Sequence, residues 1–319
     1  MITVIGEGAW GTAVATVLAH NHQELFLWCY DSQVQKFIER TRHNERYLPG
    51  IYLSENIIPT TDLAGAISKS SWIFESTPVQ FLRSVLVPLD KKVVEGKKWV
   101  VLSKGIEKDS LLLPTQLLNE LFGVTDYTVL FGPSFARELA EQKLTAVTLA
   151  AENFLLAQDV QKLIQNDYFK TFLSEDVIGV QCAGAFKNVL ALILGILEGA
   201  GYADNTKAFV FTRGLHEIVQ LSKQLGAHEQ TFYDLSGIGD MVLTAYGKSS
   251  RNVLVGQCIG KGQTVEHILQ ETGTIPESIN TLTSMRQLIE EKKCNLPLLN
   301  GIYDIVFNQL SVSEFLKII

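Results

Sequence analysis

The first half of the chain alternates short apolar runs with amphipathic stretches. Six runs rich in β-branched and aromatic residues have the length of buried strands, namely Thr3–Ile5, Leu25–Trp28, Trp72–Ser76, Trp99–Leu102, Thr128–Phe131 and Ala146–Leu149. Helical spacing of apolar positions, with Gly, Pro, Asn and Ser at the joins, marks the stretches between them, such as Thr12–Ala19, Gln33–Arg42, Val79–Val87 and Leu111–Phe122. The alternation predicts βαβ units and a doubly wound parallel sheet of the α/β class.

After about Ser174 the pattern changes to longer apolar stretches at helical spacing, for example Thr206–Leu225, Val265–Gln270 and Ile279–Lys292. We expect a mostly α-helical second domain, whose first helix takes its N-cap and first-turn acidic signals from residues 174–176. The predicted domains are residues 1–175 and 176–319. Two domains also suit the length, because one hydrophobic core rarely serves more than about 250 residues.

The most apolar segment, Val177–Leu197, has the composition of a buried core helix. Polar residues interrupt it at Gln181, Lys187 and Asn188, whereas a membrane span needs about 18 or more apolar residues with few or no charges. A secretory signal needs basic residues before its apolar stretch, and the first Lys or Arg here is Lys36. We therefore expect a cytoplasmic protein that is not integral to a membrane.

Composition and charge narrow the classes of function. With 46% hydrophobic and 19% charged residues, the chain should fold rather than stay disordered. The formal net charge is −7 and no run of Lys or Arg is dense enough for a nucleic-acid-binding patch, so no nucleic-acid partner is expected. The four cysteines form no CxxC pair and the six histidines are scattered, which predicts reduced thiols and no metal site.

Three glycines form a G-x-G-x-x-G motif between the first predicted strand and the next helix: Gly6, Gly8 and Gly11. In a dinucleotide-binding turn, these permit the tight bend, the approach of backbone to the pyrophosphate and the packing of helix on strand. The helix N-terminus then offers unpaired N–H groups to the phosphates. Ordinary turn glycines are the alternative, which the position between strand and helix disfavours.

The second strand ends at Asp31, twenty residues after Gly11, where a ribose-binding carboxylate is expected. The same aspartate is equally suited to cap the next helix, and both roles are compatible. Its neighbour Tyr30 carries no positive charge for a 2′-phosphate. The sequence leaves NADH and NADPH both open as the cofactor.

Two polar clusters follow predicted strands at the end where ligands bind in open α/β sheets. Ser103-Lys104-Gly105 comes after one strand, and Gly132–Ala136 (GPSFA) comes after another. The second cluster offers backbone amides near Ser134. Each cluster alone is equally consistent with an ordinary loop.

Lys187 lies in an otherwise apolar helical segment. The residues at three- and four-residue spacing on its face are apolar: Val180, Ala183, Gly184, Leu190 and Ala191. A buried lysine is costly unless it is paired, and desolvation would lower its proton affinity and suit it to proton transfer. The alternative is a lysine whose stem crosses apolar surface to reach water.

A carboxylate partner and an anion-binding group occur further along. Asp240 is flanked by Gly237 and Gly239, which allow backbone to approach a ligand closely; a helix cap is the alternative. Arg251 beside Asn252 joins a forked guanidinium to an amide, a pairing suited to bidentate phosphate recognition. Alone, Arg251 would more often be a surface charge.

Short motifs in sequence order resemble those of the bacterial-type NAD(P)-dependent glycerol-3-phosphate dehydrogenase family: GEGAWGTA, RYLPGI, STPV, SKGIE, GPSFARE, GAFKNV, ADNTKA, TRGL, SGIGDMVLT and SRN. The resemblance implies a Rossmann domain followed by a helical domain like that of 6-phosphogluconate dehydrogenase. It implies reversible NAD(P)H-dependent reduction of dihydroxyacetone phosphate to sn-glycerol 3-phosphate for glycerophospholipid synthesis. A homodimer is the family expectation.

The resemblance also implies roles for residues. Lys187 matches the family's proton donor and acceptor, and Asn188, Asp240 and Thr244 match positions that orient it and the substrate. The positions matched to substrate contacts are Lys104, Gly132, Ser134, Lys187, Asp240, Ser250, Arg251 and Asn252. With the glycine motif and Asp31 included, the expected cofactor contacts are Gly6, Gly8, Ala9, Trp10, Gly11, Tyr30, Asp31, Lys104, Ala136, Arg251, Ile275 and Glu277.

The sequence departs from the family pattern in places, and two other classes of function compete. Tyr30 replaces the Arg or His of many relatives, TAYGKSSRN lacks their usual cysteine, and IPES replaces a familiar Glu-Gly pair near Glu277. A related NAD(P)-dependent hydroxy-acid or ketopantoate-type dehydrogenase would share the glycine turn and the helical lysine, but not a phosphate clamp at SRN. A nucleotide-sensing Rossmann protein without catalysis would not need a buried lysine.

Overall fold

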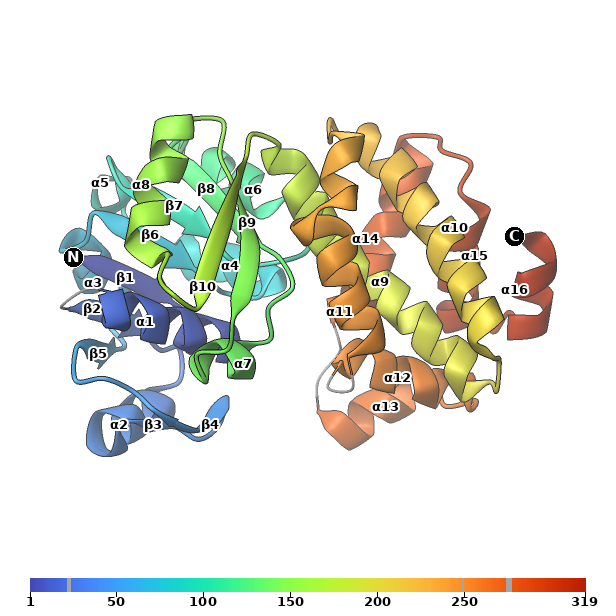
Figure 1. Ribbon diagram of the computed structural model, residues 1–319, viewed down its shortest axis with the longest axis horizontal. Helices are drawn as coiled ribbons and strands as arrows, with labels where there is room; N and C mark the ends of the chain where they lie inside the picture. Colours follow the sequence, from blue (N-terminus) through green and yellow to red (C-terminus); the bar gives the residue numbers. More distant parts are fainter. Residues whose placement is uncertain (22–23, 248–249, 274–276) are drawn as a thin grey trace. The chain divides into compact units, whose positions relative to one another are not determined.

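The computed structural model describes residues 1–21, 24–247, 250–273 and 277–319, and its contacts divide the chain into two units (Figure 1). The first unit comprises Met1–Lys104 and Leu112–Val177. The second comprises Gly105–Leu111 and Ile178–Ile319.

An eight-stranded sheet organises the first unit. Its strands, in spatial order, are β10 (Phe169–Ser174), β9 (Thr145–Ala150), β8 (Tyr127–Phe131), β7 (Lys98–Val101), β6 (Trp72–Glu75), β1 (Ile2–Ile5), β2 (Leu25–Trp28) and β5 (Ile57–Thr60). The six from β5 to β8 are parallel and follow the 3-2-1-4-5-6 order of a Rossmann fold. The order reverses between β1 and β6, so the carboxyl ends of these two strands flank the crevice where ligands of such folds bind.

Helices cover both faces of this sheet, with α1 and α8 together on one of them (Figure 1). The helices are α1 (Ala9–Asn21), α2 (Ser32–Thr41), α3 (Leu63–Ser68), α4 (Val79–Leu86), α5 (Lys91–Val94), α6 (Pro114–Phe122), α7 (Ala136–Ala140) and α8 (Phe154–Ile164). A small antiparallel pair, β3 (His43–Asn44) and β4 (Leu48–Tyr52), follows α2. Because both faces are covered, the central strands are mostly apolar, and every residue of β1 is buried.

The prediction of a doubly wound sheet is confirmed, with differences at its margins. One pairing is antiparallel, because β9 runs against β8 while β10 runs along β9. The strands β3, β4, β5 and β10 were not predicted: β3 has only two residues, β4 and β5 contain Pro49 and Pro59, and prolines are tolerated mainly at sheet edges. The helix expected from Leu111 begins at Pro114, where proline takes the first-turn position that needs no N–H partner.

Among the described residues of the second unit, every regular element is helical. The α-helices are α9 (Val177–Gly199), α10 (Asp204–Lys223), α11 (Asp240–Tyr246), α12 (Arg251–Gly260), α13 (Val265–Thr272), α14 (Glu277–Glu291), α15 (Pro297–Phe307) and α16 (Val312–Ile318). A 3-10 turn, η1 (Glu229–Tyr233), and a π turn, η2 (Leu235–Gly239), lead into α11. α9 enters this unit at Ile178, one residue after it begins.

α9 is the longest helix of the described chain and is strongly apolar. By length and composition alone it is the one helix there that qualifies as a membrane span, and 94% of its most apolar stretch is buried inside the protein. The core helix of a folded domain passes the same test, and Figure 1 shows α9 among the other helices of its unit. The expectation of a buried core helix is therefore confirmed.

α9 and α12 cross with their backbones in contact. A β-carbon on Gly195 of α9 would lie 2.2 Å from the carbonyl oxygen of Val253, and one on Gly256 of α12 would lie 2.2 Å from that of Leu192. The same approach recurs one turn further along both helices. Only glycine fits at these positions, because the obstructing atoms belong to the main chain rather than to flexible side chains.

Candidate functional site

The glycine motif forms a tight turn between β1 and α1. Gly6 has φ +108°, a left-handed value that favours glycine. A β-carbon on Gly11 would lie 2.1 Å from the carbonyl oxygen of Gly6, so α1 packs closely against the turn. A β-carbon on Gly8 would meet nothing within 4 Å. The main chain at Gly8 therefore faces open space immediately before the helix.

These residues fit a dinucleotide. α1 begins at Ala9, so the N–H groups of its first turn and the positive end of its dipole lie beside the open space at Gly8. The indole Nε1 of Trp10 is buried and has no hydrogen-bond acceptor among the described residues. A pyrophosphate here would bring acceptor oxygens to the N–H groups at the start of α1.

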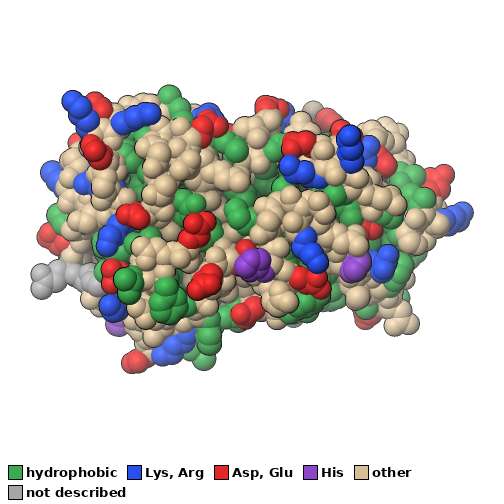
Figure 2. Space-filling view, turned by 90° about the horizontal axis from the view of Figure 1, so that it is seen from above, with side chains coloured by type: hydrophobic (Ala, Val, Ile, Leu, Met, Phe, Trp, Pro, Cys, Tyr) green, Lys and Arg blue, Asp and Glu red, His purple; other side chains and the backbone are tan. Residues whose placement is uncertain are grey.

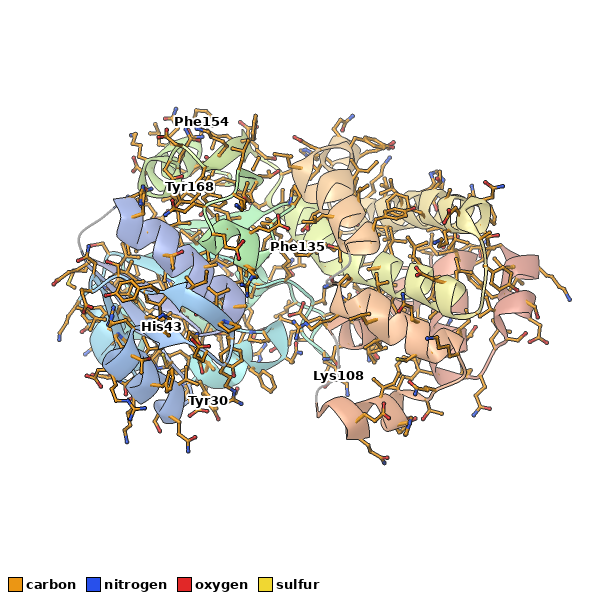
Figure 3. All side chains as sticks on the ribbon, turned by 60° about the horizontal axis from the view of Figure 1, so that its bottom comes forward. Tyr30, His43, Lys108, Phe135, Phe154 and Tyr168 are labelled. Carbon is orange, nitrogen blue, oxygen red and sulfur yellow. The ribbon has the colours of Figure 1, made fainter. Side chains whose placement is uncertain are left out.

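At the end of β2, Asp31 caps α2. Its Oδ1 accepts a hydrogen bond of 2.8 Å from the Gln33 N–H, while its Oδ2 lies 2.6 Å from Nη1 of Arg46. Tyr30 is 79% exposed and projects from the surface (Figure 3). The capping role foreseen for Asp31 is present, and its position at the strand end leaves the ribose role compatible with it.

Glu7, inside the glycine motif, was not singled out from the sequence. Its side chain is buried, and its two carboxylate oxygens accept hydrogen bonds from the backbone N–H groups of Tyr30 (3.0 Å) and Asp31 (3.1 Å). The only signal was an acidic residue at a variable position of the motif. Sequence spacing alone does not show which N–H groups that residue meets.

A second buried carboxyl, Glu75 at the end of β6, was also missed. It accepts hydrogen bonds from Ser103 Oγ at the end of β7 and, at 2.5 Å, from the Thr77 N–H. Burial raises the pKa of Glu75 to about 7, and the hydrogen bonds from Ser103 and Thr77 only partly oppose this. A charged residue directly after the apolar run WIF was the available signal.

The two polar clusters at the strand ends lie where they were expected, after β7 and β8. Lys104 follows Ser103, and its Nζ lies 5.2 Å from the ring centroid of Phe131. Beyond β8, Ser134 Oγ donates a 2.9 Å hydrogen bond to the carbonyl of Gly132, and α7 begins at Ala136. These residues share the carboxyl edge of the sheet with the glycine turn, because β1, β7 and β8 point the same way.

In the second unit Lys187 forms a buried polar cluster with two residues of α11. Its Nζ lies 2.6 Å from Oδ1 of Asp240 and donates a 2.9 Å hydrogen bond to Oγ1 of Thr244. Lys187 is 8% exposed and Asp240 1% exposed. Asp240 and Thr244 are four residues apart and share one face of α11. The pairing offsets the cost of burying the charges, and Lys187 does not extend to the surface.

A second polar chain joins three helices of this unit. Asn252 at the start of α12 donates a 3.0 Å hydrogen bond to Oδ1 of Asn188, which follows Lys187 on α9. The amide of Asn188 in turn lies 3.4 Å from Oε2 of Glu277, the first residue of α14. The predicted residues of these three helices are thus brought together by direct contacts.

The remaining predicted residues lie at the beginning of α12 or outside the described chain. Ser250 is buried and caps α12 by accepting a 3.5 Å hydrogen bond from the Val253 N–H. Arg251 is exposed in the first turn of this ten-residue helix. Ile275 lies outside the described residues, so the structure places no side chain for that predicted contact.

Surface charge and potential metal ligands indicate no further site among the described residues. Basic and acidic side chains are interspersed over the face shown in Figure 2. Within the described ranges, no group of three or more His, Cys, Asp or Glu residues is placed to hold a metal ion.

A sheet with Rossmann strand order, joined in one chain to a helical unit that buries a lysine on a carboxylate, defines an NAD(P)-dependent dehydrogenase. Profiles described as NAD-dependent glycerol-3-phosphate dehydrogenase N-terminus and C-terminus match residues 1–157 and 176–317. The chain belongs to the NAD-dependent glycerol-3-phosphate dehydrogenase family, as the sequence motifs indicated.

Individual relatives agree with this assignment. Glycerol-3-phosphate dehydrogenase [NAD(P)+] of Bacillus pumilus (strain SAFR-032) is 37% identical over 98% of this chain and 92% of its own. The crystal structure of glycerol-3-phosphate dehydrogenase from Coxiella burnetii superposes with a TM-score of 0.93, at 29% identity over 99% of this chain and 97% of that one. A PanE/ApbA family ketopantoate reductase from Ralstonia eutropha reaches a TM-score of 0.62 at 13% identity, over 96% and 97% of the two chains, which is a likeness of fold alone.

Proposed function

We propose that this chain catalyses the reversible NAD(P)H-dependent reduction of dihydroxyacetone phosphate to sn-glycerol 3-phosphate, which supplies glycerophospholipid synthesis. The observation that carries the proposal is the buried cluster of Lys187, Asp240 and Thr244 in a member of this family. A sensor of nucleotides would have no use for such a cluster. A ketopantoate-type activity has only a likeness of fold in its favour.

Most of the proposed cofactor contacts belong to the first of two proposed domains, residues 1–175 and 176–319. The glycine turn and the N-terminus of α1 are suited to the pyrophosphate, and the end of β2 is suited to the ribose. When bound, the nicotinamide supplies the hydride for reduction and accepts it in the reverse direction. The residues proposed to contact the cofactor are Gly6, Gly8, Ala9, Trp10, Gly11, Tyr30, Asp31, Lys104, Ala136, Arg251, Ile275 and Glu277.

Lys187 is the proposed proton donor. Reduction of a ketone adds a hydride to carbon and a proton to oxygen, and the ammonium of Lys187 provides that proton to the carbonyl oxygen. The carboxylate of Asp240 holds the ammonium in place through its 2.6 Å contact, and Thr244 accepts a second N–H. In the reverse direction the neutral amine takes the proton from the alcohol. Asn188 orients the substrate beside it.

The start of α12 is the proposed site for the substrate phosphate. Arg251 and Asn252 lie in its first turn, where backbone N–H groups and the helix dipole also favour an anion. Such a local positive site would allow a chain of net charge −7 to bind an anionic substrate. Lys104, Gly132, Ser134 and Ser250 complete the proposed substrate contacts.

A homodimer and a cytoplasmic location form part of the proposal, because both are expected of the family. Size-exclusion chromatography with light scattering would measure the oligomeric state. A mass of 35.4 kDa, that of one chain, would contradict the dimer.

The activity is tested by mixing the protein with dihydroxyacetone phosphate and either NADH or NADPH and following the cofactor absorbance. We expect oxidation of at least one cofactor, with sn-glycerol 3-phosphate as the product. A phosphate-free keto acid such as ketopantoate serves as the matched comparison. Turnover of the keto acid without turnover of dihydroxyacetone phosphate would overturn the proposal.

A further inference from the structure

The buried carboxylate of Glu7 holds the end of β2 from inside the glycine turn. Glu7 is 6% exposed, and each of its carboxylate oxygens accepts one backbone hydrogen bond, from Tyr30 at 3.0 Å and from Asp31 at 3.1 Å. Its main chain is fixed as well, since its carbonyl oxygen accepts hydrogen bonds from Thr12 Oγ1 (2.9 Å) and Asn44 Nδ2 (2.8 Å). Hydrogen bonds to both its side chain and its main chain thus fix Glu7 at the end of β2.

The end of β2 is the place where a Rossmann fold distinguishes the two nicotinamide cofactors. A carboxylate there accepts a hydrogen bond from the ribose 2′-hydroxyl of NAD, whereas the 2′-phosphate of NADP is accommodated by a cationic side chain. A phosphate also needs N–H donors that have no other acceptor. In this chain the N–H groups of Tyr30 and Asp31 are already bonded to Glu7.

The charges at this strand end also disfavour binding of a 2′-phosphate. Glu7 and Asp31 place two carboxylates there, and Arg46 is engaged with Asp31 through a 2.6 Å ion pair. The buried thiol of Cys29, next to Tyr30 in the chain, experiences the same field. Burial, and after it the negative charges of Glu7 and Asp31, raise the pKa of Cys29 above its ordinary value.

We propose that Glu7 is a specificity-determining residue that makes the cofactor site selective for NADH over NADPH. It acts in two ways: it occupies the two N–H groups that a 2′-phosphate would need, and it adds a fixed negative charge behind Asp31. Asp31 remains available to the 2′-hydroxyl. The inference rests on the proposed function only in that the cofactor is a nicotinamide dinucleotide.

The test measures binding of NADH and NADPH by titration calorimetry in the absence of substrate. The wild-type protein should bind NADH at least about tenfold more tightly than NADPH, since like charges at a binding site oppose association. Glu7→Gln removes the charge but keeps an amide oxygen as an acceptor. We expect this variant to bind NADPH about tenfold more tightly than the wild type does, with an affinity for NADH within about threefold of the original.

Glu95→Gln is the matched control. It removes the same charge from an exposed residue just before β7, at the opposite, amino-terminal edge of the sheet, and should leave the ratio of the two affinities unchanged. Asp31→Asn is a second variant that does not alter the turn. It should shift the ratio toward NADPH because it removes the neighbouring charge, and the wild-type ratio of affinities keeps the inference testable if Glu7→Gln does not fold.

Three results would overturn the inference. The first is a wild-type protein that binds NADPH as tightly as NADH. The second is an unchanged ratio of affinities in folded Glu7→Gln. The third is a selective loss of NADPH binding in Arg46→Ala, which would show that the arginine reads the 2′-phosphate. The binding measurement uses no substrate. If the protein did not turn over dihydroxyacetone phosphate, the proposed function would be contradicted, but the measured preference between NADH and NADPH would still stand.

Discussion

The Nζ atom of Lys187 on α9 lies 2.6 Å from Oδ1 of Asp240 on α11, although 53 residues separate the two in the chain. Both side chains are buried, so each charge depends on the other for compensation. Thr244 takes a second hydrogen bond from the same ammonium. Asp240 compensates the charge of the lysine and Thr244 helps to fix its orientation. This arrangement suits a group that donates a proton and later takes one back.

Lys187→Met should lower the turnover of dihydroxyacetone phosphate by about a hundredfold or more, the scale of general acid catalysis. NADH binding, measured by calorimetry, should be retained. The exposed Lys223→Met is the control and should leave turnover unchanged. The double variant Lys187→Met with Asp240→Asn leaves no unpaired buried charge, and so separates loss of chemistry from loss of folding. Unchanged turnover in the folded variants would show that the lysine is structural.

Arg251→Ala should weaken the use of the phosphorylated substrate. Loss of a charge-assisted contact costs roughly 1.5–3 kcal/mol, so kcat/KM for dihydroxyacetone phosphate should fall by about 10- to 150-fold. The activity with unphosphorylated dihydroxyacetone, at saturating cofactor, should fall much less. Lys261→Ala removes an exposed cation at the opposite end of α12 and is the matched control. An equal loss for both substrates would contradict a phosphate-binding role.

Glu75→Gln should alter how stability depends on pH. The pKa of Glu75 is raised from 4.5 to about 7 in the folded protein, so the folded state binds this proton more tightly than the unfolded state. The stabilisation is complete below about pH 4.5 and is lost as the pH rises through about 7. Glutamine does not ionise, and its amide can still bond to Ser103 and to the Thr77 N–H.

The measurement compares urea unfolding of the wild type and Glu75→Gln at pH 5 and pH 8. Over this interval the wild type should lose about 2–3 kcal/mol of stability relative to the variant, since one pKa unit corresponds to about 1.4 kcal/mol. Glu95→Gln should follow the wild type. If Glu75→Gln has the same pH dependence as the wild type, Glu75 is not the titrating group.

Gly256→Ala should destabilise the helical unit. Its β-carbon would lie 2.2 Å from the Leu192 carbonyl oxygen, which cannot move without shifting α9. Overpacking of this kind costs about 1–3 kcal/mol or more, measurable as a lower midpoint of thermal unfolding. Leu254→Ala, at an exposed position of the same helix, should change stability by about 0.5 kcal/mol or less. A Gly256→Ala variant as stable as the wild type would show that α9 and α12 separate easily.

The glycine turn and the apolar helix around Lys187 were predictable because each is specified by neighbours along the chain. Gly6, Gly8 and Gly11 lie between a strand and a helix, and the residues around Lys187 repeat at helical spacing. Strands at the margins of the fold were harder to predict from the sequence. β4 and β5 contain prolines, and β10 is at the edge of the sheet, so none shows the continuous apolar run of a central strand.

The hydrogen-bond partners of Glu7 and Glu75 could not be predicted from sequence patterns. Glu75 meets Ser103 because β6 and β7 are adjacent and end together, and Glu7 meets Tyr30 because β1 and β2 do. Parallel strands are joined only through long crossovers, so such pairs are distant in the chain. Periodicity predicts which face of an element is buried, but not which side chain of another element it meets.

The crossing of α9 and α12 through their glycines has a consequence for which molecules are turned over. Asn188 and Asn252 come from these two helices, and main-chain contact sets how far apart the helices lie. Under the proposed function, the carbonyl is handled from α9 and the phosphate from α12. The fixed spacing of the two helices then sets the distance between a substrate's reactive carbon and its phosphorus. A phosphate ester one carbon longer should therefore bind poorly because of its length and not because of its charge.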